Sequence, residues 1–462
     1  MDSIAVLRRK VKDSLRFAFL EGAPAGIALG IMDNFVNPLA VALGASNVQI
    51  GVLNSLPRLF VSLSQLKTAD LVERVGSRRR LIVPAVFLHA LSFLPIALMP
   101  FLVASTVLSP GVALPLLTLG YVWCMVSAHF AGPAWGSMLS DLVPVRRRGS
   151  YFGRRDRLLG FVSVLSVFLA GYYLNWREAS ASGGLLTKKE AALFGFFVVF
   201  LVAGSARTIS GYLMTLIYEP PLRIKEEHYF SFWDFLRRAP EGNFGRYVAF
   251  VAVIHFAVLM SGPFFSVFML RDLEFSYLTY SVLVAVAHTF ALLSGPFWGK
   301  YADKVGNLKV LRICSCILPF LPILWVFSQD VRYLFFVQIL SGIGWGGFNL
   351  CSVNFVYESA IPEKRTRCVS YYSATNGIAA FVGTLLGGVL ANHLPHLMGY
   401  RLLFLFLLSG ILRALAGVFL LTRVKEVRGV VEPLPTKPVR PGSGPEAVSA
   451  SGGPGIGEGS SG

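Results

Sequence analysis

The chain has 462 residues, of which 54% are hydrophobic and only 15% are charged, and its formal net charge is +17. A soluble protein carries about 25% charged residues, so this composition excludes an ordinary soluble domain. The basic residues lie in short segments between long apolar runs, where they orient a membrane protein and meet anionic lipid. We therefore expect an integral membrane protein without a nucleic-acid partner.

Apolar runs of about 20 residues, the length that crosses a bilayer as a helix, recur along most of the chain. They are too long for transmembrane β-strands and do not alternate in polarity. The runs predict twelve membrane-spanning helices over residues 17–43, 48–71, 81–103, 112–139, 156–176, 191–217, 246–270, 276–298, 308–328, 332–357, 370–394 and 401–422.

Two segments fall outside these runs. In residues 218–245, aromatic side chains alternate with charged ones in the stretch FSFWDFLRRAP. This pattern favours a short cytoplasmic helix in the lipid headgroup plane over a plain linker. Residues 424–462 are rich in Pro, Gly and Ser, so they lack apolar surface to bury, and we expect a disordered cytoplasmic tail.

Lys and Arg concentrate in the even-numbered connections between the predicted helices and are scarce in the odd-numbered ones. This asymmetry places both termini in the cytoplasm. One odd-numbered connection departs from the pattern, with Arg177, Lys188 and Lys189. The basic connections contain Arg78, Arg79 and Arg80, then Arg146, Arg147 and Arg148, then Arg237 and Arg238, then Lys300 and Lys304, and finally Lys364 and Arg365.

Two tight turns between predicted helices share one pattern. Residues 298–312, WGKYADKVGNLKVLR, contain a glycine, an acid four residues later, and a second glycine at the turn, followed by basic residues. Residues 69–80, ADLVERVGSRRR, are a degenerate copy with Ala and Glu in place of the first glycine and the acid. The pair resembles the signature loops that follow the second and eighth helices in the major facilitator superfamily.

This resemblance implies an all-α fold of twelve transmembrane helices in two pseudo-symmetric six-helix halves, over residues 1–217 and 246–423. The pattern Gly-x-x-Arg-x-x-x-Gly around both Arg207 and Arg413 supports such a repeat.

The resemblance also implies that the two loops act as conformational latches. Asp70 or Glu73 would face the start of the eleventh helix, around Ser370, and Asp303 would face the start of the fifth, near Arg154 and Arg155. Gly299 is expected to let two helix backbones approach closely, and Gly306 to adopt a positive φ. The latch residues are Asp70, Glu73, Gly76, Arg78, Gly299, Asp303 and Gly306.

Charged side chains at membrane depth are costly and mark candidate functional sites. On a helical projection, Asp33 lies within about 40° of Gly22, Gly26 and Asn37. That small and polar face suits a cavity, with helix packing on the glycines as the alternative. Arg58 lies in the middle of the next predicted helix, and we expect it to pair with Asp33.

Five further intramembrane residues are candidates. His255 could relay protons, and Trp345 and Asn349 lie in a helix that lines the cavity in the superfamily; an ordinary packed core is the alternative for all three. Arg207 and Arg413 lie past the middle of matching helices. We expect these two to be structural, bonding helix carbonyls or bracing the cytoplasmic side.

The predicted function is secondary transport of a small solute by alternating access, with Asp33 as the proton-coupling group; a uniporter or a sodium-coupled carrier is the alternative within this class. Its partners would be the solute, protons and membrane lipid. We expect a monomer in the plasma (bacterial inner) membrane. No nucleophile–base set, metal-ligand cluster or ATP-binding loop is present in the sequence, so we expect no enzyme, metal or cofactor. The alternatives are a non-transporting scaffold with this fold and a drug-efflux antiporter. Efflux is disfavoured because the fourth predicted helix lacks the Arg, and the fifth the Pro, that such antiporters usually carry.

Overall fold

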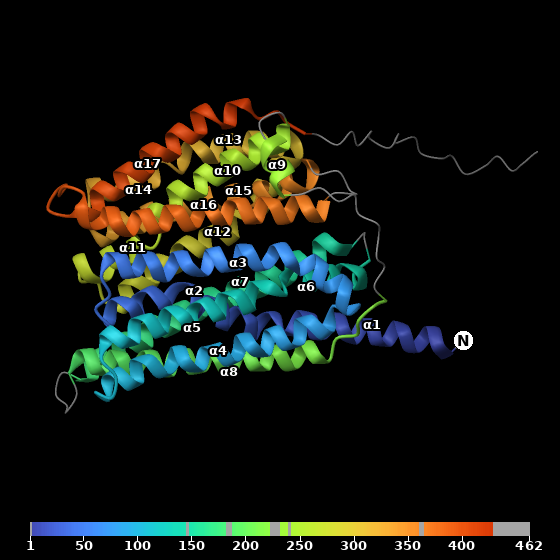
Figure 1. The fold of residues 1–462 in the computed structure, drawn as a ribbon, viewed down its shortest axis with the longest axis horizontal. Helices are drawn as coiled ribbons and strands as arrows, with labels where there is room; N and C mark the ends of the chain where they lie inside the picture. Colours follow the sequence, from blue (N-terminus) through green and yellow to red (C-terminus); the bar gives the residue numbers. More distant parts are fainter. Residues whose placement is uncertain are drawn as a thin grey trace, which may run out of the picture. The chain divides into compact units, whose positions relative to one another are not determined.

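The computed structural model describes residues 2–144, 147–181, 187–221, 232–238, 242–359 and 365–427, and this part of the chain is almost entirely helical (Figure 1). Most of the predicted linker and the tail from residue 428 onward lie outside the described residues. The helices of the N-terminal part are α1 (Asp2–Leu20), α2 (Gly22–Ala42), α3 (Asn47–Val75), α4 (Arg79–Ala104), α5 (Pro110–Phe130), α6 (Gly132–Leu142), α7 (Arg148–Ser180) and α8 (Lys188–Thr215). After the short α9 (Phe232–Arg238) follow α10 (Asn243–Ser261), α11 (Phe264–Val267), the π-helix η3 (Phe268–Asp272), α12 (Tyr277–Val305), α13 (Asn307–Ile317), α14 (Phe320–Phe327), α15 (Val331–Ser359), α16 (Arg365–His393), α17 (Arg401–Phe419) and the 3₁₀-helix η5 (Leu421–Arg423).

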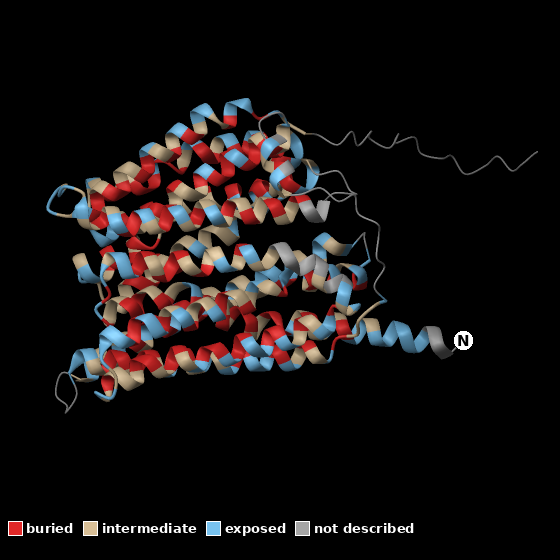
Figure 2. Cartoon of the chain, in the orientation of Figure 1, coloured by how far each residue is buried: buried red, intermediate tan, exposed pale blue. Residues whose placement is uncertain are grey.

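Eleven helical segments of the described residues are long and apolar enough to cross a membrane. The more polar α3 is the twelfth, so the predicted all-α architecture of twelve helices is confirmed. Large apolar side chains point outward from these helices, including Leu119, Phe161 and Phe336, which are 64%, 65% and 69% exposed. Figure 2 shows buried positions mainly where helices face one another. Exposed apolar surface of this extent fits contact with lipid.

The helices form two groups of six crossings. In the first, α4 packs on α5 and α8, and α2 packs on α7 and α8; in the second, α12 packs on α15, and α10 packs on α16 and α17. The groups meet mainly through α3 against α16 and α7 against α12 (Figure 1). We call these groups the N-terminal and the C-terminal half.

Prolines interrupt three of the crossings. A proline lacks the N–H that continues the helical ladder and clashes with the preceding turn. Breaks accordingly fall beside Pro133, between α5 and α6, beside Pro263, between α10 and α11, and beside Pro319, between α13 and α14. The last two breaks lie close to the cavity described below.

The tight turns expected from the sequence are present. Gly76 and Gly306 have φ values of 66° and 93°, a region that side chains other than glycine rarely adopt, so their predicted conformation is confirmed. Gly299 differs from expectation, because a Cβ there would meet only the Leu350 side chain, at 3.7 Å. The close backbone approach lies instead at Gly342 of α15, where a Cβ would fall 2.3 Å from the carbonyl oxygen of Ala287.

An acid that follows the last helix of each half caps the helix after the tight turn. Glu219 accepts hydrogen bonds from the backbone N–H of Arg78, at 2.6 Å, and from the Ser77 hydroxyl, at 2.7 Å. Glu426 accepts from the backbone N–H of Leu308, at 2.9 Å. An acid at a helix N-terminus contributes about 0.3–1 kcal/mol. The same side-chain capping interaction therefore occurs once in each half.

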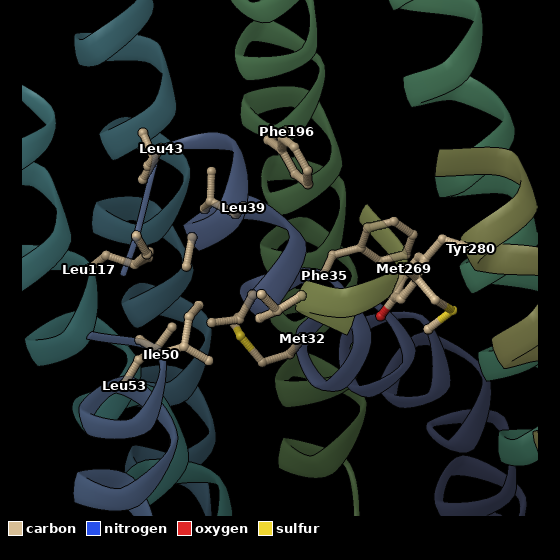
Figure 3. Close-up of a cluster of buried hydrophobic side chains, with 14 of the residues drawn as sticks. Met32, Phe35, Leu39, Leu43, Ile50, Leu53, Leu117, Phe196, Met269 and Tyr280 are labelled. Atoms are coloured by element: carbon tan, nitrogen blue, oxygen red, sulfur yellow. The ribbon is translucent and has the colours of Figure 1, made fainter. Parts of the chain in front are cut away.

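The two ends of the bundle are packed differently. We call the end that carries Arg78, Arg148 and Lys304 the basic end, and the opposite one the far end. At the far end, one apolar core includes side chains of both halves, and Figure 3 shows Phe35 of α2 beside Met269 of η3 and Tyr280 of α12. Phe35 and Tyr280 meet edge to face, with ring centroids 6.2 Å apart.

At the basic end, each half has its own apolar core. One lies around Met138 and Met214 of the N-terminal half, and the other around Phe250 and Phe355 of the C-terminal half. Helix α9 packs Phe235 on the C-terminal half, beside Val248 and Tyr371. Burial therefore joins the halves at the far end and leaves them with separate cores at the basic end.

Candidate functional site

A cavity of about 320 Å³ lies between the halves, lined by α2 on one side and by α10, α11, η3, α12, α14, α15 and α17 on the other. Its volume is at the lower end of the range for small-molecule sites. Its walls combine aromatic side chains, including Phe265, Trp325 and Trp345, with charged Asp33 and Arg413. An apolar pocket with a few convergent polar groups is the usual form of a ligand site.

Asp33 and Asn37 of α2 both line this cavity. The Asp33 carboxylate is exposed to it and makes no hydrogen bond or ion pair with a described residue. About two turns earlier on the same face, Gly26 packs on α7, where a Cβ would fall 2.6 Å from the carbonyl oxygen of Leu159. Both interpretations of this face therefore apply at different heights, with helix packing on α7 at Gly26 and the cavity at Asp33 and Asn37.

Arg58 and His255 lie in a second polar group, outside the residues that line the cavity. Arg58 of α3, His255 of α10 and Asn376 of α16 each have a buried polar atom without a hydrogen-bond partner. The charge of Arg58 acts electrostatically on Asp33, but no ion pair joins the two within the described residues. The direct pair expected from the sequence is therefore not formed in this conformation.

Of the two candidates on α15, Trp345 lines the cavity and Asn349 does not. The Asn349 side chain is exposed. Gly346 and Gly347, which lie between these two residues in the sequence, pack closely on α12 and α13. A Cβ at Gly346 would fall 2.4 Å from the Ser294 hydroxyl, and one at Gly347 would fall 2.6 Å from the Cys314 sulfur. One stretch of α15 thus serves both the cavity and helix packing.

Arg207 belongs to a buried charge network in the N-terminal half. It donates to Nδ1 of His89 at 2.9 Å and to the Ser210 hydroxyl at 2.8 Å, and its Nη1 lies 3.5 Å from a carboxylate oxygen of Glu21. Glu21 is fully buried and also accepts from Arg155, at 2.6 Å, and from Ser210, at 2.7 Å. The network links α2, α4, α7 and α8 and leaves Glu21 satisfied.

Arg413 occupies the matching place in the sequence repeat but has different neighbours. It is 3% exposed and donates to the Leu318 carbonyl, at 3.2 Å, and to the Ser261 hydroxyl, at 3.1 Å. Within a helix that carbonyl would accept from residue 322, but Pro322 has no N–H. Arg413 therefore meets a helix carbonyl as expected, and it also lines the cavity.

The latch residues are placed only in part. The side chains of Asp70 and Glu73 lie outside the described residues. Arg78 is bound inside its own half, to Asp141 at 2.6 Å. Asp303 is exposed and has no hydrogen bond or ion pair with a described residue, while Arg155, its expected counterpart, binds Glu21 instead.

Hydrogen bonds that join described residues of the two halves lie toward the far end. Asn47 of α3 donates to the Asn392 side chain at 3.0 Å and accepts from Arg271 at 2.7 Å. Tyr280 donates to the carbonyl oxygen of Asn34 at 2.7 Å. These bonds close the far end over the cavity.

Sequence reasoning missed three kinds of residue. The cavity role of Arg413 was hidden because its repeat partner Arg207 suggested a structural role for both. The capping acids Glu219 and Glu426 could have been found, since each follows the repeated arginine of its half at a similar spacing. Trp325 gave no signal, because a tryptophan in an apolar run has nothing to distinguish it from core.

Comparison with known proteins gives a family match in the second half of the chain. The family model described as Major Facilitator Superfamily matches residues 248–451. A curated relative, the efflux pump azaK of Aspergillus niger, is 30% identical over 95 residues, which are 21% of this chain and 20% of that protein. The chain thus matches only about a fifth of the length of that relative.

Solved structures resemble nearly the whole chain. The xylose transporter XylE from E. coli, in a partially occluded inward-open conformation, has a TM-score of 0.65 at 13% identity and covers 91% of this chain and 99% of its own. A bacterial homologue of the human lysosomal transporter Spinster, inward-facing and occupied, has a TM-score of 0.65 at 15% identity and covers 89% of this chain and 96% of its own. Likeness at such identities establishes the fold alone.

Proposed function

We propose that this chain, which belongs to the major facilitator superfamily, is a secondary transporter that carries a small solute across the membrane by alternating access. The observation that carries the proposal is the cavity of about 320 Å³ between the two halves, with Asp33 and Arg413 facing it. Charges at such depth are costly, so charged residues kept there mark candidate functional sites. The fold places solute sites at the interface of its repeats.

The packing of the two ends supports alternating access. A shared core and cross-half hydrogen bonds close the far end, whereas the basic end has two separate cores. A rocking motion of one half against the other would reverse this arrangement. The positive-inside rule makes the basic end cytoplasmic, so the conformation corresponds to an inward-facing state.

Asp33 is the proposed proton-binding group. It faces the cavity without a hydrogen-bonded partner among the described residues, so a proton can reach it and compete with the charge of Arg58. Proton binding on the open side and release on the other would couple solute movement to the proton gradient.

Export and a non-transporting scaffold are the two alternatives to this function, and one experiment distinguishes them. The similarity to an efflux pump favours export as a second candidate. A scaffold that kept the fold would have no need of a charged cavity. Uptake of solutes identified by a ligand-stabilisation screen, measured in proteoliposomes with and without an imposed pH gradient, tests the proposal. Absence of protein-dependent flux for every stabilising solute would favour the scaffold.

The proposed orientation gives a labelling prediction. A single cysteine at Asp303, which is exposed just before the Gly306 turn, should react with a membrane-impermeant maleimide only after cells are opened, whereas one at Ser109 should react in intact cells. The reason is the concentration of Lys and Arg at the end that contains Gly306. The background for both is a variant without the exposed native thiol of Cys316. Labelling of position 303 from outside intact cells would refute the orientation.

The far-end hydrogen bonds give a prediction about the conformational equilibrium. Asn47→Ala removes its bonds with Asn392 and Arg271. At about 0.5–1.5 kcal/mol each, their loss should raise the population of the outward-open state by roughly tenfold. The measurement is the rate at which an impermeant maleimide added from the far side labels a cysteine at Ser266 in the cavity wall.

Gln49→Ala is the matched control for this experiment, because the hydrogen bonds of Gln49 stay within its own turn, to Ser46. We expect its labelling rate to equal that of the parent protein. An unchanged rate in Asn47→Ala would show that these bonds do not hold the far end closed.

A further inference from the structure

One wall of the cavity contains a buried cation that the protein does not neutralise. Among the described residues that line the cavity, Arg413 is the one with a permanent positive charge, and no described acid forms an ion pair with it. We propose that the solute is an organic anion, whose carboxylate binds Arg413 and whose apolar body packs against Trp325 and Phe265. This inference rests on the proposed function only in taking the cavity as the solute site.

The hydrogen bonds of Arg413 leave donors free for a ligand. A guanidinium has five N–H groups, and the two bonds to Leu318 and Ser261 use Nη1 and Nη2 once each. Its Nε is buried without an acceptor. An unsatisfied buried donor is unfavourable, and a carboxylate is the acceptor that matches the guanidinium fork best.

The comparison with Arg207 shows that this lack of a counter-charge is specific to the C-terminal half. Both arginines lie in the pattern Gly-x-x-Arg-x-x-x-Gly. Arg207 has Glu21 within 3.5 Å, whereas both hydrogen-bond partners of Arg413 are neutral. A buried cation without a counter-ion is strongly unfavourable, so the negative charge is expected to come from the bound solute.

The surroundings of Arg413 indicate what the rest of the anion is like. Val258, Leu321, Phe265 and Trp325 line the same C-terminal wall of the cavity. The rings of Phe265 and Trp325 are packed with centroids 5.0 Å apart. The aromatic pair favours an apolar or aromatic group on the anion, and Ser266, Gln338 and Ser341 of the same wall can meet polar substituents.

The opposite wall explains why a single negative charge is favoured. Asp33 of α2 faces the same cavity. An anion on Arg413 and a proton on Asp33 would together leave the cavity without net charge. A zwitterion that used its amine on Asp33 is the competing arrangement, and the experiment below includes it.

The test uses four probes that share a phenyl body: 3-phenylpropanoate, its neutral analogue 3-phenylpropanamide, the zwitterion phenylalanine and the cation 2-phenylethylamine. Binding to the purified full-length protein in detergent is measured by calorimetry, without any gradient. We expect 3-phenylpropanoate to bind about tenfold or more tightly than the amide. Arg413→Gln should remove that preference, and Arg413→Lys should retain part of it. Arg423→Gln, which changes an exposed arginine at the end of the same segment, should leave it intact.

Equal binding of acid and amide, tightest binding of phenylalanine, no binding of any probe, or an unchanged preference in Arg413→Gln would each overturn the inference. If Arg413→Gln fails to fold, the four probes on the parent protein and Arg413→Lys still decide. Because no transport is measured, anion binding without flux would refute the proposed function alone, and flux of a neutral solute without anion preference would refute this inference alone.

Discussion

Asp33→Asn is expected to abolish accumulation of solute driven by a pH gradient while leaving exchange of solute across the membrane largely intact. Asparagine has nearly the shape of aspartate but cannot bind and release a proton in this pH range. Since Asp33 has no hydrogen bond or ion pair with a described residue, the substitution should disturb little packing. Proteoliposomes loaded with solute and assayed for both counterflow and gradient-driven uptake separate the two activities.

The control for this experiment is Asp13→Asn on α1. Asp13 is 53% exposed and has only a 4.0 Å contact with Arg9, so both activities should match those of the parent protein. If Asp33→Asn accumulates solute against its gradient as well as the parent does, Asp33 is not the coupling group. His255 would then be the next candidate, because Glu21 is fully buried and already bound by two arginines.

The predicted helices follow the structure closely because hydropathy reports directly on length in the bilayer. The differences have a physical pattern. The predicted helix over 276–298 continues as α12 to Val305, since Lys300, Asp303 and Lys304 are compatible with a helix although they are too polar for the membrane. Hydropathy therefore identifies the apolar part of a helix that lies in the membrane, and not the residue at which its backbone hydrogen bonds end.

The sequence pattern also did not predict the breaks inside individual membrane-spanning segments. Pro322 leaves the Leu318 carbonyl without its helical donor, and Arg413 supplies the replacement. The same sequence contains Pro38 and Pro57 inside the continuous helices α2 and α3. A proline alone therefore does not predict a break, because neighbouring helices decide whether the freed carbonyl finds another partner.

The sequence predicted those site residues that their position deep in a membrane-spanning segment is enough to identify. Asp33 and Trp345 were named from their place in the membrane, and both line the cavity. Arg207 has a buried counter-charge, Glu21, and Arg413 has none among the described residues. Glu21 is far from Arg207 in the sequence, so no local pattern predicts this difference. The expected pair of Asp33 and Arg58 likewise assumed that adjacent helices turn their charges toward each other, whereas the backbone of Arg58 packs against Gly377 of α16.

The second large effect is expected for Glu21→Gln, which should destabilise the N-terminal half severely. Glu21 is the counter-charge for Arg155, at 2.6 Å, and for Arg207, at 3.5 Å, in a site where it is 0% exposed. Removing one partner of a buried ion pair costs about 3–5 kcal/mol, because the remaining charges stay buried without compensation. The measurement is the free energy of unfolding in mixed micelles, together with the yield of monodisperse protein.

Two further variants make this prediction specific to charge. Glu274→Gln makes the same chemical change at an exposed position and should shift the free energy of unfolding by less than about 0.5 kcal/mol. Glu21→Gln combined with Arg207→Gln returns the network to the net charge of the parent protein and should recover part of the loss, as expected for residues that share one network. A double variant no more stable than Glu21→Gln would mean that the loss comes from packing at Glu21. A parent-like stability for Glu21→Gln itself would show that the network does not brace α2 against α7 and α8.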